Sequence, residues 1–139
     1  MAVYQNTLGI HTKGLGHYEI TRDVERELNR SKLSTGIVSV FCRHTSCSLV
    51  MMENADPSAW RDLQAWLERL VPENDPGFRH TLEGADDMPA HIKMTLSRTS
   101  EMIPFSEGRL LLGAWQGIFL WEHRRSAHER NLIFTAMGE

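Results

Sequence analysis

The stretch that decides the fold is Gly36-Ile37-Val38-Ser39-Val40-Phe41-Cys42-Arg43, followed closely by Ser46-Cys47-Ser48-Leu49-Val50-Met51-Met52. The first segment is rich in β-branched and aromatic residues and predicts a strand, and the second segment is a further strand candidate. Four more strands are predicted outward from this stretch. They cover Val3–Ile10, Tyr18–Ile20, Arg109–Trp121 with interruptions at Gly113 and Gly117, and Asn131–Thr135.

Only a few helices accompany these strands. Thr21 can cap a first helix that carries Val24 and Leu28 on its inner face. The clearest helix begins near Asp56-Pro57, where the carboxylate can accept hydrogen bonds from exposed N–H groups and the proline suits the first turn. A short helix is expected from Pro89 to Leu96. Few helices against many strands predict an α+β fold with antiparallel pairing.

Length and composition narrow the class of protein. The 139 residues fit a single domain spanning residues 1–139. Acidic residues exceed basic ones, 18 against 15, so nothing favours nucleic acid or an anionic membrane as a partner. No apolar run approaches the roughly 20 residues needed to span a bilayer, and the N-terminus lacks the plan of a signal peptide. We therefore expect a cytoplasmic protein in which Cys42 and Cys47 are free thiols.

Polar side chains gather first in His44-Thr45-Ser46-Cys47-Ser48. Strand alternation would place His44, Ser46 and Ser48 on one face. An imidazole and two hydroxyls there could bind an oxyanion, hold a metal or move protons. The alternative is a turn at the end of a strand, with locally bonded hydroxyls.

The second polar segment is His80-Thr81-Leu82-Glu83-Gly84-Ala85-Asp86-Asp87-Met88-Pro89-Ala90-His91-Ile92-Lys93. Its clustered aspartates repel one another unless a cation, a lysine or a proton offsets their charge. The spacing between the two histidines matches no local metal motif. Asp87 could instead cap the helix beginning near Pro89, and the negative charge of Asp86 would then interact favourably with the positive end of the helix dipole. That role leaves both histidines and Lys93 unexplained.

The third segment is Gly113-Ala114-Trp115-Gln116-Gly117, followed by Glu122. In an uninterrupted strand Gln116 and Glu122 share a face with apolar neighbours and need polar partners if they are buried. Alternatively, Glu122 lies at an exposed strand end near Arg124 and Arg125. The remaining histidines lack clustered partners and are predicted to lie on the surface: His11, His17, His123 and His128.

Together with Glu53-Asn54-Ala55-Asp56-Pro57, these segments resemble the YjbQ-like family of small bacterial and archaeal proteins. The resemblance runs over nearly the whole chain in the same order, and Glu83–Lys93 is its longest ungapped motif. It implies a β-rich sandwich of mostly antiparallel strands with a few flanking helices, assembled as a homotrimer. It also implies secondary thiamine-phosphate synthase activity, which joins a pyrimidine pyrophosphate to a thiazole phosphate and releases pyrophosphate.

Such a reaction needs charge neutralisation of the leaving group, usually by a divalent metal with Lys or Arg. As a hypothesis, His44, His80 and His91 converge on a metal, with Asp86 or Asp87 as a further ligand or a supporting partner. Three imidazoles suit Zn or another transition metal better than Mg. If Mg arrives with the substrate, Glu83 and the two aspartates become the better ligands.

Residue type and resemblance assign the other roles. The candidate catalytic residues are His44, Glu53, Asp87, His91 and Lys93. Lys93 and the hydroxyls of the first polar segment would hold phosphate, and Glu53 could act as a base, orient His44 or belong to a turn. The candidate substrate contacts are Ser46, Ser48, Asn54 and Gln116.

The expected partner is a small phosphorylated metabolite. Two functional classes other than the synthase stay open. One is a metal-dependent hydrolase or phosphatase, which would turn over with water and no second substrate. The other is a non-catalytic trimeric protein that binds a metal or a metabolite, which would retain its ligand without turnover.

Overall fold

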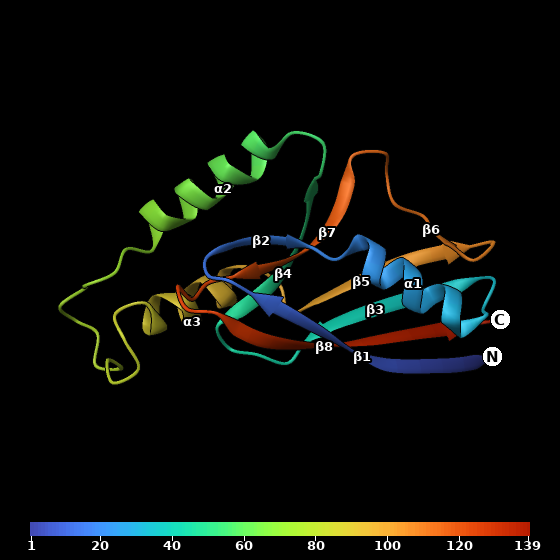
Figure 1. Cartoon of the computed structure of the whole chain (residues 1–139), viewed down its shortest axis with the longest axis horizontal. Coiled ribbons are helices and arrows are strands. Elements are labelled where there is room, and N and C mark those ends of the chain that lie inside the picture. Colours follow the sequence, from blue (N-terminus) through green and yellow to red (C-terminus); the bar gives the residue numbers. More distant parts are fainter.

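Burial alternates along the strands at the centre of the fold, so that each of them turns one face to the interior. In β3 (Gly36–Cys42), Val38 and Val40 are buried whereas Ile37 and Phe41 are exposed. The computed structural model, which describes residues 1–139, arranges the strands in two antiparallel sheets (Figure 1). This confirms the predicted α+β class.

The larger sheet has five strands in the order β1-β8-β3-β5-β6, and the smaller sheet has the order β2-β7-β4. Strand β8 lies between β1 and β3, and its pairing with β1 runs from Ala2–Gly138 to Thr12–His128. The other strands and their bounds are β1 (Ala2–Thr12), β2 (Gly16–Glu19), β4 (Cys47–Glu53), β5 (Ser100–Ser106), β6 (Arg109–Leu110), β7 (Gln116–Glu122) and β8 (His128–Gly138).

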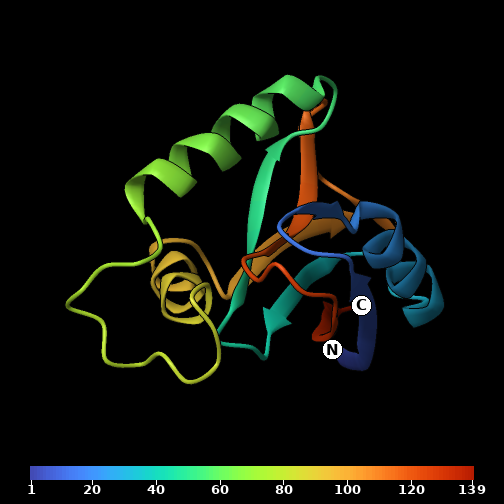
Figure 2. The ribbon, with the colours of Figure 1, turned by 60° about the vertical axis from the view of Figure 1, so that its left-hand side comes forward.

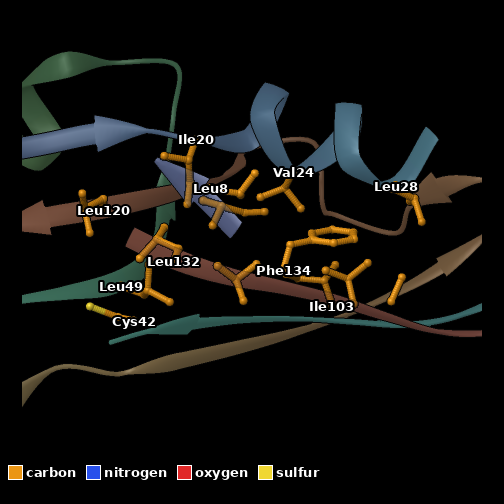
Figure 3. Packing of buried hydrophobic residues seen from close by; sticks show 14 of the residues in the cluster. Leu8, Ile20, Val24, Leu28, Cys42, Leu49, Ile103, Leu120, Leu132 and Phe134 are labelled. Atoms are coloured by element: carbon orange, nitrogen blue, oxygen red, sulfur yellow. The ribbon is translucent and has the colours of Figure 1, made fainter. Parts of the chain in front are cut away.

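The main core lies between the two sheets and helix α1 (Thr21–Ser31). As predicted, Val24 and Leu28 are buried on the inner face of α1, and Figure 3 shows them directed toward Phe134 and Ile103 of the larger sheet. Complete burial of each such side chain contributes about 1.5–3 kcal/mol to stability.

The start of α1 differs from the prediction. Ile20 occupies the position before the helix, and no side chain caps it. The Thr21 hydroxyl instead accepts a hydrogen bond from the backbone N–H of Ile118 and donates to Glu19. The predicted capping role of Thr21 is therefore wrong, because that hydroxyl joins α1 to β7.

Helix α2 (Pro57–Leu70) begins as predicted, since Asp56 Oδ1 accepts a hydrogen bond of 2.9 Å from the Ser58 N–H. Leu67, Val71 and Trp121 form a second, small core on the far face of the smaller sheet. Figure 2 shows α2 and α3 (Asp87–Leu96) on one side of the molecule and α1 on the other. No helix of the structure has the length and apolar character needed to cross a membrane.

The predicted strand over residues 109–121 is in fact two strands, β6 and β7. Between them, Gln116 Oε1 accepts a hydrogen bond from the Gly113 N–H, and the Gln116 N–H donates to Gly113 O. This local turn competes with strand pairing and separates the two elements.

Candidate functional site

The centre of the candidate site is a cluster of two histidines and one aspartate. Asp87 and His91 lie one turn apart on α3, and His80 reaches them from the preceding loop. His80 Nε2 is 2.8 Å and His91 Nε2 is 3.0 Å from the same oxygen, Asp87 Oδ2. One ligand atom from each of the three side chains lies within 4.8 Å of the others. Three such donors can hold one metal ion.

The ring of His91 has an acceptor on each side. Its Nδ1 lies 2.5 Å from the backbone oxygen of Thr45, which can only accept a hydrogen bond. Its Nε2 faces the carboxylate of Asp87. A neutral imidazole carries one N–H, and when Nδ1 carries it the Nε2 lone pair is free to bind a cation. A carbonyl bonded to Nδ1 is a common support for histidine metal ligands.

Arg124 holds the carboxylates of α3 in place. It donates to Asp87 Oδ1 at 2.8 Å, to Asp86 Oδ2 at 3.1 Å and to the backbone oxygen of Glu83 at 2.9 Å. Asp86 also accepts from the backbone N–H of Arg125. Sequence reasoning missed Arg124, treating it only as a possible neighbour of Glu122, although adjacent aspartates call for a cation.

Asp87 is buried, with an exposed fraction of 1%. Burial by itself raises the pKa of its carboxyl, but the hydrogen bond from His80 and the charges of His91 and Arg124 together outweigh that effect. The pKa of Asp87 therefore lies below its usual range, and the carboxylate is ionised at neutral pH. Its predicted capping role is not seen, because α3 begins at Asp87 itself and its side chain faces the histidines.

An open cavity of about 580 Å³ adjoins the cluster. Its apolar wall comes from α3, and His80 and His91 supply its imidazoles. The lining residues are Thr45, His80, Met88, His91, Ile92, Met94 and Thr95. None of them is a lysine, an arginine or a carboxylate, so the cavity combines an apolar surface with polar groups at the cluster.

The structure does not bring His44 into the cluster. His44 Nε2 accepts a hydrogen bond of 2.8 Å from the backbone N–H of Asn131, so its ring is held against β8. The reason is that residues 43–46 form a loop instead of continuing a strand. The expected shared face of His44, Ser46 and Ser48 is therefore wrong, and so is the expected convergence of three histidines. Asp87, rather than Asp86, is the carboxylate beside His80 and His91.

Three candidate phosphate-binding residues face the interior instead of the cavity. Lys93 is buried and pairs with Glu68 of α2. Ser46 accepts a hydrogen bond from Arg130, and Ser48 bonds with His123. The surface prediction for His123 is wrong, because it is fully buried; burial lowers its pKa to about 3.

Glu122 is fully buried and pairs with Arg130, which contradicts the alternative of an exposed strand end. The prediction that Glu122 shares a strand face with apolar residues is confirmed, because Ile118 and Leu120 of the same strand belong to the main core. Gln116 lies at the exposed opposite end of β7.

The remaining candidate residues lie far from the cluster. Glu53 pairs with Gln116 at one end of the β4–β7 ladder, and Cys47 pairs with Glu122 at the other. Six strand steps separate these ends by about 20 Å. Glu53 accepts a hydrogen bond from the backbone N–H of Asp56, which fits its turn role. Asn54 donates its backbone N–H to the Trp115 carbonyl.

Proteins with similar sequences include the UPF0047 protein sll1880 of Synechocystis, which is 46% identical over 98% of this chain and 92% of its own length. The UPF0047 protein YjbQ of Escherichia coli O157:H7 is 39% identical over 98% of this chain and 99% of its own length.

Similar folds occur in two crystal structures. The conserved hypothetical protein TT1486 of Thermus thermophilus is 36% identical with a TM-score of 0.83, covering 92% of this chain and 97% of that one. An uncharacterised YjbQ/UPF0047 protein of Clostridium acetobutylicum is 30% identical with a TM-score of 0.85, covering 96% and 99%. The family model described as UPF0047 protein YjbQ-like matches residues 6–139. The chain belongs to the YjbQ-like UPF0047 family.

Proposed function

We propose that His80, Asp87 and His91 bind a divalent transition metal and that the protein is a metal-dependent hydrolase of a small metabolite. The observation that carries this proposal is the convergence of two imidazole Nε2 atoms on one carboxylate oxygen. Two histidines and one carboxylate suit Zn, Mn or Fe and leave coordination positions open for water and substrate. A metal bound there supplies Lewis acidity and lowers the pKa of a bound water.

The surrounding residues support this role by orienting the donors. The Thr45 carbonyl fixes the proton of His91 on Nδ1 and turns its Nε2 toward Asp87. Arg124 holds the other carboxylate oxygen of Asp87, so that Oδ2 stays directed to the histidines. Asp87 is ionised at neutral pH and is ready to bind a cation without losing a proton first.

The cavity favours hydrolysis over the transfer reaction that the family resemblance implies. Displacing pyrophosphate calls for cations around the leaving group. The cavity lining contains neither lysine nor arginine, and Lys93 is already paired with Glu68. Met88, Ile92 and Met94 instead provide contacts for an apolar part of the substrate. A hydrolase needs only water as its second reactant, which this open cavity admits.

We further propose that copies of the chain associate through the outer face of the five-stranded sheet, as a homotrimer. No helix of the chain covers this face, and the register aligns Val3, Met137 and Ile37 across three adjacent strands. Phe41 and Met102 extend the exposed apolar surface. Contiguous apolar surface of this kind is typical of an interaction site. A Phe41→Asp variant should be smaller than the wild type in light scattering coupled to size exclusion, and an unchanged mass would oppose this interface.

Bound metal in untagged protein is the first test, by elemental mass spectrometry after incubation with Zn or Mn. We expect a near-stoichiometric metal in the wild type and its loss in His91→Ala. His11→Ala is the matched control, because His11 also lies 2.5 Å from a carboxylate, Glu129, but belongs to β1 and not to the cluster. No metal in the wild type, or equal loss in both variants, would rule out the proposed centre.

The reaction class is tested on metal-loaded protein with a panel of small esters, amides and phosphate esters. Hydrolysis without a second substrate, lost in Asp87→Asn, supports the hydrolase. Metal retention with no turnover of any compound would instead favour a non-catalytic binding protein.

A further inference from the structure

The two cysteines form a sulfur pair beneath the loop that supports His91. Cys42 ends β3 and Cys47 begins β4, and their Sγ atoms are 3.5 Å apart. Both are free thiols, as the sequence predicted, and both are buried. The distance is a van der Waals contact between sulfurs, so the pair needs to approach by only about 1.5 Å to reach the disulfide bond length of about 2.05 Å.

The surroundings polarise the pair. The hydrogen bond from Cys47 lowers the pKa of the Cys42 thiol, and the guanidinium of Arg130 acts in the same direction, against burial and the charge of Glu122. The pKa of Cys47 is raised by the same hydrogen bond and by burial. The separation of 3.5 Å places the two sulfurs to react with one another, and we take Cys42, whose pKa is lowered, as the attacking thiol.

The connection between the cysteines carries the contacts that reach the candidate site. It consists of four residues, 43–46, and the oxygen of Thr45 accepts the hydrogen bond from His91 Nδ1. Ser46 is held by Arg130, and His44 is held by the backbone of Asn131. Because only four residues join the two cysteines, a movement of the sulfurs has to be taken up by this loop and by the three contacts that hold it.

We propose that Cys42 and Cys47 form a reversible disulfide with a peroxide as the oxidant, and that its formation moves the Thr45 carbonyl relative to His91. The Cys42 thiolate attacks one peroxide oxygen, the O–O bond breaks, and the leaving oxygen takes a proton to become water or an alcohol. The resulting sulfenic acid is attacked by the Cys47 sulfur, the S–O bond breaks, and water leaves with the Cys47 proton. Each disulfide thus forms with the two-electron reduction of one peroxide.

Burial selects the oxidant by size. The pair is buried under a loop whose Arg43 and Thr45 are exposed, so oxidation requires a local opening of this loop, and hydrogen peroxide needs the smallest one. Glutathione disulfide is far larger and needs the attacking thiolate at the surface. The structure therefore assigns a peroxide-specific modification site, and a thiol reductant that reaches the opened loop returns it to the free thiols.

The test uses the full chain, freed of metal by a chelator and treated with hydrogen peroxide. We expect the intact mass to fall by two hydrogens, both free thiols to disappear in a thiol titration, and dithiothreitol to restore them. Cys47→Ser should stop at a sulfenic acid, seen as a gain of one oxygen in the intact mass. Glutathione disulfide should leave both thiols free. Persistence of both thiols, a disulfide between chains, or oxidation of wild-type protein beyond sulfenic acid would overturn the proposal.

The coupling is measured separately from imidazole signals in nitrogen-edited NMR spectra, assigned with a His91→Ala variant. The His91 signals should move on oxidation and return on reduction, while those of His11 stay unchanged. A disulfide with unmoved His91 signals would refute the coupling. The role of His91 as a metal ligand rests on the proposed function, but the mass and NMR measurements do not depend on it. If the metal test fails, the mass and NMR measurements still decide whether the disulfide forms and whether it moves the Thr45 carbonyl.

Discussion

Replacing Glu122 by glutamine tests the buried ion pair that supports the site loop. Glu122 is fully buried and Arg130 is 4% exposed. Arg130 Nε donates to Oε2 at 2.8 Å, and its Nη2 donates to Oε1 at 2.8 Å. Glu122→Gln keeps the shape but leaves the guanidinium buried without a countercharge. Breaking one side of a buried pair costs about 3–5 kcal/mol. Since the amide oxygen can still accept one hydrogen bond, we expect a loss of about 3 kcal/mol in the free energy of unfolding.

Glu101→Gln is the matched control. Glu101 is also buried, but its partner Arg98 has a side chain that is 66% exposed. That guanidinium can return to water, so the expected loss is within about 1 kcal/mol. Urea unfolding followed by circular dichroism gives both values, at one protein concentration because assembly of copies would raise the apparent stability.

Equal losses in the two variants would refute this reasoning, because it attributes the difference to the burial of the cation. A second check is the double variant Glu122→Leu with Arg130→Met. Removing both charges should recover part of the loss seen in Glu122→Gln, since apolar residues often replace a buried pair without a large cost.

Three further predictions concern the site and its frame. Arg124→Gln should weaken Zn binding by roughly 10- to 100-fold in a chelator competition, and an unchanged affinity would exclude Arg124 as a support of Asp87. Burial lowers the pKa of His17 to about 4 from its usual value of 6.5, so the unfolded chain binds more protons between these values. Stability should therefore fall as pH drops from about 6.5 to 4, and His17→Phe should flatten this part of the curve measured by urea unfolding; an identical pH slope would contradict it. Asp56→Ala should cost about 0.5–2 kcal/mol in the same assay through loss of the α2 cap, whereas Asp75→Ala, outside any helix, serves as its control.

Local sequence signals predicted most of the framework. The content of β-branched and aromatic residues located β3, the next segment was correctly proposed as a strand, and the Asp56-Pro57 pair located the start of α2. These features depend on neighbours in the chain, which a single sequence displays. The failures came where a side chain changed the local outcome, as at the turn closed by Gln116 between β6 and β7.

Only part of the candidate site could be predicted, because some of its contacts depend on residues that are distant in the sequence. His80 and His91 were identified, but starting α3 at Pro89 concealed the spacing of four residues that places Asp87 beside His91. Arg124 comes from a turn 37 positions beyond Asp87, and no local pattern links the two. Continuing the strand through residue 44 brought His44 to the wrong place, because backbone pairing ends at Cys42 and resumes at Cys47.

The place of β8 in the larger sheet has a consequence for how the chain is made. This strand leaves the ribosome after the seven other strands, yet it separates β1 from β3 and supplies Leu132, Phe134 and Ala136 to the core. Until it emerges, β1 has no partner and the apolar residues of β3 face no complete interior. Pairings between residues 2–12 and 128–138 also require closure of a very long loop, because all the other strands lie between these two segments in the sequence. Nascent chains of this protein therefore carry unpaired strand edges until β8 has been made, the period in which a chaperone has most to protect.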